Sequence, residues 1–237
     1  MSVLPYDQRG SKREQVERMF DAISPRYDLI NHLCSFGVDQ RWRQLVVKAL
    51  HERGANKVLD VATGTADLAI MAAGNGMHVT GIDISAGMLE HGRKKTKQRG
   101  MRDRIELLQA DSEALPFADG SFDAVMVAFG VRNFEHLEKG LAEMHRVIKS
   151  GGTIAILEFS RPSGLWGGLF RFYFHRVMPV IGCLVSRDAS AYTYLPQSVA
   201  TFPEGEAFTG LLRKTGCVEV TARRLTGGIA TLYLAGR

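Results

Sequence analysis

The stretch Lys57–Ile70, with the sequence KVLDVATGTADLAI, decides the fold of this 237-residue chain. The apolar run over 57–61 indicates a strand, the Gly-Thr pair behind it a turn, and residues 65–74 a helix. A second strand is expected over 78–83 and a second helix over 85–99. Strands and helices that alternate at this spacing are typical of a parallel sheet covered by helices.

The same alternation continues through most of the chain. Further strands are expected over 105–109, 122–127 and 153–159, further helices over 13–23, 41–53, 135–149 and 206–215, and a closing hairpin over 218–221 and 229–235. The sequence therefore predicts a doubly wound, Rossmann-like α/β fold in one domain. We divide it into an N-terminal helical cap (1–55), a cofactor-binding core (56–160), an aromatic and basic lid insertion (161–205), and a closing helix and hairpin (206–237).

Composition excludes several classes of protein. Apolar residues make up 45% of the chain and charged residues 23%, which is ordinary for a globular protein. The three cysteines form no CxxC pair and the histidines no metal-binding spacing, so we expect a reducing cytoplasm and no metal. No signal peptide is visible, and no apolar run is long enough to span a bilayer. The net charge of +5 points to an acidic partner.

Carboxylates follow three successive predicted strands. In a doubly wound sheet ligands bind at the carboxyl ends of the strands, so Asp60, Asp83 and Asp111 should meet at one edge. Asp83 suits two ribose hydroxyls and Asp111 an adenine amino group, while Asp60 and the backbone at Gly64 suit an ammonium group. Each of these residues also has an ordinary reading, as a turn residue or a helix cap.

The turn itself narrows the choice of nucleotide. Its sequence, GTADLA over 64–69, lacks the GxGxxG pattern of NAD sites and the GxxxxGK[ST] pattern of a P-loop. It also holds no lysine or arginine to meet a phosphate. S-adenosylmethionine carries no phosphate, and its sulfonium cation suits an acidic surrounding. We therefore predict an S-adenosylmethionine-dependent methyltransferase.

Several segments resemble one methyltransferase family. The matching stretches are 20–28, 31–37, 58–68, 113–117, 129–133, 146–152, 157–162, 192–198, 202–203 and 227–230. In these the chain resembles the quinone C-methyltransferases, which methylate demethylmenaquinone or the ubiquinone precursor. The segments Pro25–Asp28 and Phe129–Asn133 are the most specific to that family.

The resemblance implies a class I methyltransferase fold, with a mostly parallel seven-stranded sheet and helices on both faces. Its cofactor contacts fall on Thr65, Asp83, Asp111 and Ser112. One position departs from the family pattern, since Ala66 stands where a glycine is usual. If that position needs a positive φ, alanine costs about 1 kcal/mol there.

The resemblance also suggests which residues act on the substrate. Arg132 and Asn133 would act on the quinol oxygen, with Arg132 stabilising a phenolate; the alternative is that Arg132 pairs with an acidic neighbour such as Glu135. Tyr27 and Asp28 would serve as a proton relay or as lid clamps, and a purely structural hydrogen bond is the alternative.

The implied reaction is C-methylation of a polyprenylated quinol, demethylmenaquinol, in menaquinone biosynthesis. The alternatives are the benzoquinol precursor of ubiquinone and another small hydrophobic substrate. A nucleic-acid methyltransferase would need motifs that this chain lacks, and an NAD-linked oxidoreductase would need the missing glycines. A non-catalytic binding protein with this fold stays open. We expect no nucleic-acid partner, and a homodimer is compatible with the sequence.

Two segments carry the basic charge. Residues 93–104 hold seven basic residues and one acidic residue, a net charge of +6, and are expected to form a solvated face. Residues 161–187 hold four arginines, many aromatic residues and no carboxylate. Such a lid suits an anionic membrane surface or the wall of a polyprenyl pocket, although a core helix packed on the sheet is the alternative. We therefore expect peripheral contact with the inner face of the membrane.

Overall fold

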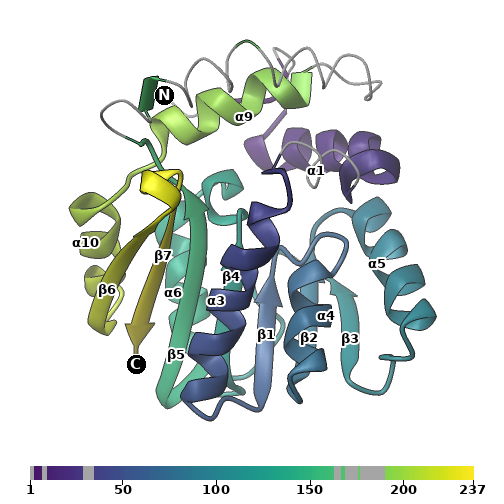
Figure 1. Cartoon of the computed structure of the whole chain (residues 1–237), viewed down its shortest axis with the longest axis vertical. Helices are drawn as coiled ribbons and strands as arrows, with labels where there is room; N and C mark the ends of the chain where they lie inside the picture. Colours follow the sequence, from purple (N-terminus) through teal and green to yellow (C-terminus); the bar gives the residue numbers. More distant parts are fainter. Residues whose placement is uncertain (1–2, 7–9, 29–34, 163–166, 169–175, 177–189) are drawn as a thin grey trace.

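The central feature of the molecule is one mixed sheet (Figure 1). The computed structural model describes residues 3–6, 10–28, 35–162, 167–168, 176 and 190–237. The strands are β1 (Lys57–Val61), β2 (His78–Asp83), β3 (Ile105–Gln109), β4 (Phe122–Ala128), β5 (Ile148–Phe159), β6 (Val218–Leu225) and β7 (Ala230–Gly236). In the described part of the chain they form a seven-stranded sheet in the order β3-β2-β1-β4-β5-β7-β6. Among the described strands, β7 alone runs opposite to the other six, which confirms the predicted doubly wound fold.

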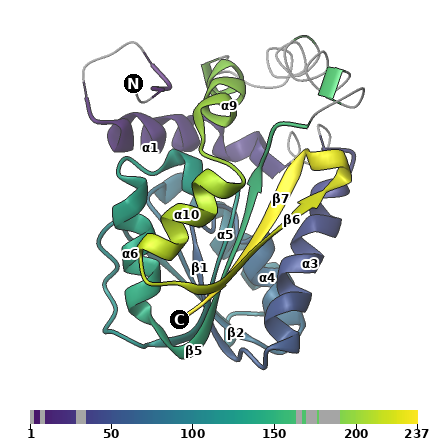
Figure 2. The same ribbon diagram turned by 90° about the vertical axis from the view of Figure 1, so that its left-hand side faces the viewer.

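Helices cover both faces of the sheet because the strands alternate apolar side chains between two cores. Val58 packs in the core beneath α3 (Val38–Glu52), α4 (Asp67–Gly74) and α5 (Ala86–Gln98). Leu59, the next residue, packs in the core beneath α6 (Leu137–Val147) and α10 (Glu206–Lys214). Figure 2 shows these two helix layers on opposite sides of the sheet. Burial on both faces explains why β1 reads as a continuous apolar run.

A cap lies above the carboxyl ends of the parallel strands (Figure 1). It consists of α1 (Lys12–Ile23), the short helix η1 (Ser24–Arg26) and α9 (Ser190–Thr201). A capping box between Ser11 and Glu14 starts α1, and its apolar face packs with Met88 and Tyr194. The cap therefore covers the edge of the sheet at which a doubly wound fold binds its ligand.

The predicted boundary between helix and strand near residue 150 is wrong. The helix expected over 135–149 ends at Val147, and β5 begins at Ile148, so the Ser-Gly-Gly sequence lies inside the strand. The register of β4 against β5 shifts there, between Phe122 and Ala124. A Cβ on Gly152 would lie 2.7 Å from the carbonyl oxygen of Asp123, so glycine is needed for this close approach and not for ending a helix.

The region expected as a lid insertion is described only in part. Within 161–205 the structure places helix α9, which the sequence did not predict. The ranges 163–166, 169–175 and 177–189, which carry most of the aromatic and basic residues, lie outside the described residues.

Candidate active site

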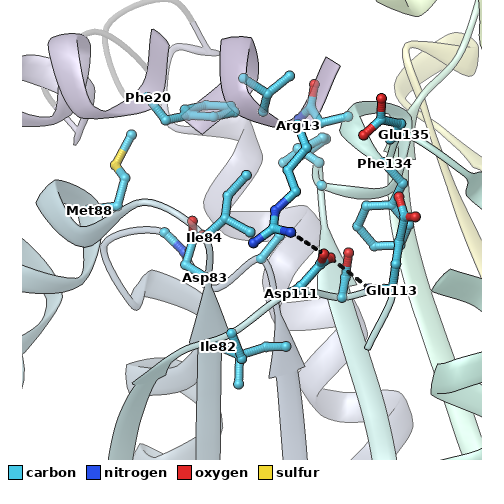
Figure 3. A pocket seen from close by; sticks show the side chains of 18 of the residues that line it. Arg13, Phe20, Ile82, Asp83, Ile84, Met88, Asp111, Glu113, Phe134 and Glu135 are labelled. Carbon is cyan, nitrogen blue, oxygen red and sulfur yellow. Dashed lines mark hydrogen bonds and ion pairs between the residues drawn. The ribbon is translucent and has the colours of Figure 1, made fainter. Parts of the chain in front are cut away.

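The strand order reverses between β1 and β4, and a cavity opens at that point. This large cavity encloses about 700 Å³, part of it open to solvent. Its floor comes from the strand ends and includes Gly64, Asp83, Asp111 and Ser112. Its roof comes from the cap, where Phe20 and Arg13 of α1 face the strand ends (Figure 3). The floor is polar and the roof largely apolar.

Asp83 is held rigidly at the end of β2. Its carboxylate accepts hydrogen bonds from the backbone nitrogens of Gly64, at 2.8 Å, and Ser85, at 2.9 Å. Burial raises the pKa of this carboxyl to about 6, although the two hydrogen bonds oppose the shift. Asp83 therefore ties the β1 turn to β2 and presents a carboxylate to the cavity, in the position suited to ribose hydroxyls.

Asp60 lies behind the same turn, in a second cavity. This small cavity, of about 320 Å³, is lined by Tyr27, Arg43, Asp60, Ala62, Thr63, Gly64, Thr65, Asp67, Leu68 and Ala128. Asp60 accepts a hydrogen bond of 2.6 Å from Thr63 Oγ1. Its side chain is only 1% exposed, and this burial raises its pKa to about 7. A cationic group bound nearby would favour the ionised form.

Thr65 takes part in a clamp between the N-terminal segment and the β1 turn. Its hydroxyl donates to Asp28, and Lys95 Nζ of α5 lies 2.7 Å from the other oxygen of that carboxylate. Lys95 also pairs with Asp67 at the start of α4. Both carboxylate oxygens of Asp28 are thus bound, an arrangement that fits a clamp and a purely structural hydrogen bond alike. The proposed proton relay stays a hypothesis that these contacts do not test.

The alanine that replaces the family's usual glycine does have a positive φ, the condition under which alanine is costly at this position. Ala66 has φ 68° and ψ 23° and precedes the first residue of α4. Its methyl group is fully buried and faces Gly92 of α5, where an added Cβ would lie 3.4 Å from it. Because Ala66 lines neither cavity, its methyl group does not stand between the turn and a ligand.

Asp111 and Ser112 line the large cavity at the end of β3, as the adenine-binding hypothesis requires. Asp111 accepts a hydrogen bond from the backbone nitrogen of Glu113 at 2.9 Å. Its other oxygen lies 3.1 Å from Nη1 of Arg13, which reaches down from α1 across the cavity (Figure 3). A cofactor in this cavity would therefore meet a cap side chain as well as the strand ends.

Arg132 and Asn133 occupy the short helix η2 (Val131–Asn133), but their side chains have different surroundings. Asn133 lines the large cavity, and its Oδ1 is buried with no hydrogen-bond partner among the described residues. Arg132 does not line this cavity. Its Nη1 lies 2.8 Å from the fully buried carboxylate of Glu158 and also donates a hydrogen bond to the carbonyl oxygen of Phe129. The pairing alternative is thus realised with Glu158 of β5 and not with Glu135.

Four charged residues of the site were missed by sequence reasoning: Arg13, Arg43, Lys95 and Glu158. Each lies on a different element and reaches the site only through tertiary packing. Arg43 did leave a signal, since it falls on the buried face of α3 beside Trp42 and four residues after the buried Asp39. A buried arginine on an apolar helix face requires a polar environment.

The raised pKa values of Asp60 and Asp83 predict how pH affects the site. Unfolded aspartates ionise near pH 4, whereas these two keep their protons up to about pH 6 to 7 in the fold. The folded state binds more protons over that interval, so the free energy of unfolding of the free protein should fall as pH rises through it. A ligand bearing an ammonium group should bind more tightly as these carboxyls ionise.

Calorimetry with S-adenosylhomocysteine in two buffers of different ionisation enthalpy measures both effects. At pH 6.5 we expect proton release on binding and an affinity that increases toward pH 8. Asp60→Asn should remove most of this dependence. An affinity independent of pH between 5.5 and 8 would contradict the assignment of the two carboxylates.

Comparison with solved structures defines the class of protein. A methyltransferase from Thermotoga maritima, described as S-adenosylmethionine-dependent, superposes with a TM-score of 0.64 at 19% identity, covering 93% of this chain and 98% of that chain. A methyltransferase from Aquifex aeolicus, also described as S-adenosylmethionine-dependent, superposes with a TM-score of 0.56 at 20% identity, covering 79% and 87%. At this identity the likeness shows the fold, which is that of the class I methyltransferases.

Sequence comparison then gives the family. The model of the ubiE/COQ5 methyltransferase family matches residues 8–237. A demethylmenaquinone methyltransferase of Bacteroides fragilis is 45% identical over 98% of this chain and 96% of its own length. The ubiquinone/menaquinone biosynthesis C-methyltransferase UbiE of Geobacter sp. is 48% identical over 95% of this chain and 97% of its own length. The chain belongs to the ubiE/COQ5 methyltransferase family and is a methyltransferase.

Proposed function

We propose that this methyltransferase transfers the methyl group of S-adenosylmethionine to a ring carbon of a polyprenylated quinol, with demethylmenaquinol as its substrate. The observation that carries the proposal is the two-sided large cavity. Carboxylates at successive strand ends form one side, and apolar cap residues form the other. The names of the relatives from Bacteroides fragilis and Geobacter sp. support a quinone as the methyl acceptor.

The residues present fit the cofactor. Asp83 offers a carboxylate to the ribose hydroxyls, Asp111 and Ser112 line the place suited to adenine, and Asp60 with the backbone at Gly64 suits the ammonium group. The cofactor supplies an electrophilic methyl group on a positively charged sulfur. Acidic side chains on this side of the cavity favour that charge, whereas lysines would repel it.

The remaining side of the large cavity suits an aromatic ring with an apolar chain. Val16, Phe20, Met88 and Phe134 supply apolar surface, and Asn133 supplies a polar group among them. Its buried Oδ1 still lacks a partner in the described part of the chain, so it is available to accept a hydrogen bond from a quinol hydroxyl. Asn133 would thereby fix which ring carbon faces the methyl donor.

The chain's contribution to the chemistry is therefore orientation and electrostatics. Attack by the ring carbon requires the quinol hydroxyl to lose its proton or share it strongly as negative charge develops on the oxygen. After methyl transfer the ring carbon gives up its hydrogen as a proton and the oxygen regains one, so that one proton in all is released to water. In this proposal Arg132, the residue before Asn133 in η2, supplies positive charge that favours the developing negative charge, while Glu158 holds its guanidinium in place. Holding the ring and the methyl donor together supplies much of the remaining acceleration.

The direct test is turnover with reduced, short-chain substrates. The protein is incubated with S-adenosylmethionine and either demethylmenaquinol or the benzoquinol precursor of ubiquinone, and the products are resolved by mass. We expect a methylated product from demethylmenaquinol at a higher kcat/KM than from the benzoquinol. Methylation of the benzoquinol alone would identify the ubiquinone precursor as the substrate instead of demethylmenaquinol. No methylated product from either compound would refute the proposal.

We further propose that the protein contacts the membrane peripherally, since a polyprenylated quinol resides there. Within the described ranges, no helix combines the length and apolar character that crossing a bilayer requires. The basic segment 93–104 is largely exposed, as expected, but it leads from the end of α5 into the start of β3. Lys95 is the exception, since it pairs with Asp28 and Asp67 beside the β1 turn. The residues after α5, over 99–104, lie at the opposite end of the sheet from the large cavity (Figure 1). The arginines of 161–187 are the better source of membrane affinity.

A vesicle assay separates these two basic segments. We expect the protein to sediment with anionic vesicles but not with neutral ones, and to be released as salt increases. Replacing Arg171, Arg176 and Arg187 together by glutamine should abolish this binding. The matched control replaces Lys97, Arg99 and Arg102 by glutamine and should keep it. Equal binding to neutral and anionic vesicles would contradict the proposal. So would loss of vesicle binding in the control variant alone.

A further inference from the structure

The lining of the small cavity includes one buried cationic side chain, Arg43, to which the proposed function assigns no role. Arg43 projects from α3 toward the far side of the β1 turn, and only 8% of the residue is exposed. It shares the lining of this cavity with Asp60, Thr63 and Thr65. A guanidinium group on the outside of a cofactor-binding turn brings a positive charge to a turn that has no basic residue of its own.

The pairing of Arg43 within the fold is incomplete. Its closest carboxylate is Oδ2 of Asp39, one helical turn earlier, at 3.5 Å from Nε. That contact is too long for a hydrogen bond, and Nε has no hydrogen-bond partner among the residues that the structure describes. The guanidinium carbon also lies 5.5 Å from the centre of the Phe129 ring. A buried arginine usually satisfies its donors, so an unpaired donor here indicates a missing acceptor.

The two cavities adjoin each other. Tyr27, Ala62, Gly64 and Ala128 line both of them, so one ligand can extend from the large cavity into the small one. A ligand whose nucleoside occupies the large cavity would place its other end between Arg43 and Asp60. These two side chains present opposite charges, which complement a zwitterion.

We propose that Arg43 binds the carboxylate of the amino-acid part of S-adenosylmethionine, opposite the ammonium group assigned to Asp60. The planar guanidinium fork matches a carboxylate in two parallel hydrogen bonds, which a lysine cannot reproduce. This inference rests on the proposed use of S-adenosylmethionine. It makes Arg43 a determinant of which adenosine thioethers the protein retains, because ligands without the carboxylate gain nothing from it.

The test compares two ligands that differ only in the carboxylate. S-adenosylhomocysteine and its decarboxylated form are titrated into wild type and into Arg43→Gln by calorimetry. We expect Arg43→Gln to lower the affinity for S-adenosylhomocysteine by about 10- to 100-fold, which is the loss expected for a charged hydrogen-bond pair. The decarboxylated ligand should bind both proteins within about threefold. Arg41→Gln, an exposed neighbour on the same helix, should leave both affinities unchanged.

Other outcomes overturn the inference. An equal loss of affinity for both ligands would show that Arg43 has a structural role. Unchanged affinity for both would show that Arg43 does not contact the ligand. If Arg43→Gln does not fold, Arg43→Lys is used, because it keeps the charge. It should still lower the affinity for S-adenosylhomocysteine selectively, by a smaller factor. Equal losses of affinity for the two ligands in Arg43→Lys would also overturn the inference. Failure of the wild type to bind S-adenosylhomocysteine would instead refute the proposed function.

Discussion

Arg132→Met is expected to lower kcat for methyl transfer by about 10²- to 10³-fold, while the affinity for S-adenosylhomocysteine stays within about threefold. Arg132 does not line the large cavity, so its removal leaves the cofactor contacts in place. It does remove the positive charge of Arg132 and two contacts that hold η2, to Phe129 and Glu158. Single-turnover kinetics and calorimetry measure the two quantities separately.

Arg213→Met is the matched control for this substitution. Arg213 is half-exposed on α10 and pairs with Glu206 on the same helix. Its replacement should change neither kcat nor cofactor affinity. An unchanged kcat in Arg132→Met would exclude Arg132 from the reaction. A parallel loss of turnover and cofactor affinity would show that the variant damages the whole site.

Arg132→Met should also destabilise the fold strongly, by about 3–5 kcal/mol at neutral pH. The side chain of Glu158 is fully buried, and without Arg132 its charge has no counterion. The double variant Arg132→Met/Glu158→Gln should recover much of this loss because it removes the unpaired charge. The glutamine oxygen can still accept from the backbone nitrogen of Phe159, as Glu158 does at 2.8 Å. Urea denaturation of the three proteins measures these differences.

The destabilisation should depend on pH. Burial raises the pKa of Glu158 in the fold, and Arg132 opposes this shift. Removing Arg132 should raise this pKa further, so the folded single variant retains a proton that the unfolded chain has lost. Its free energy of unfolding should therefore fall as pH rises above the ordinary pKa of glutamate, near 4.3, and its deficit against wild type should shrink below that pH. A deficit that does not change with pH would contradict the burial of an unpaired charge.

The double variant also separates stability from catalysis. It should regain stability without regaining turnover, since the positive charge of Arg132 is still missing. Recovery of both together would show that Arg132 acts only by keeping the protein folded.

Features of the site that depend on the order of strands and helices could be predicted from the sequence. Asp60, Asp83 and Asp111 meet at one edge because parallel strands in register end together. For Ala66, by contrast, neither the positive φ nor the direction of the methyl group could be predicted from the sequence.

The contacts that long-range packing creates were not predictable in the same way. Arg43 reaches the β1 turn only because α3 packs on the sheet beside it, and Glu158 meets Arg132 from a neighbouring strand 26 residues later. Arg13 meets Asp111 only because the cap folds back over the strand ends (Figure 3). No periodicity or spacing in the sequence specifies these pairs.

The most direct test of the central claim is to locate the transferred methyl group. The protein is given S-adenosylmethionine with a deuterated methyl group and reduced, short-chain demethylmenaquinone, and the product is examined by mass spectrometry and NMR. We predict that the intact deuterated methyl group is found on a ring carbon of the naphthoquinol. A label on a quinol oxygen, or no labelled product from a protein that binds S-adenosylhomocysteine, would contradict the account.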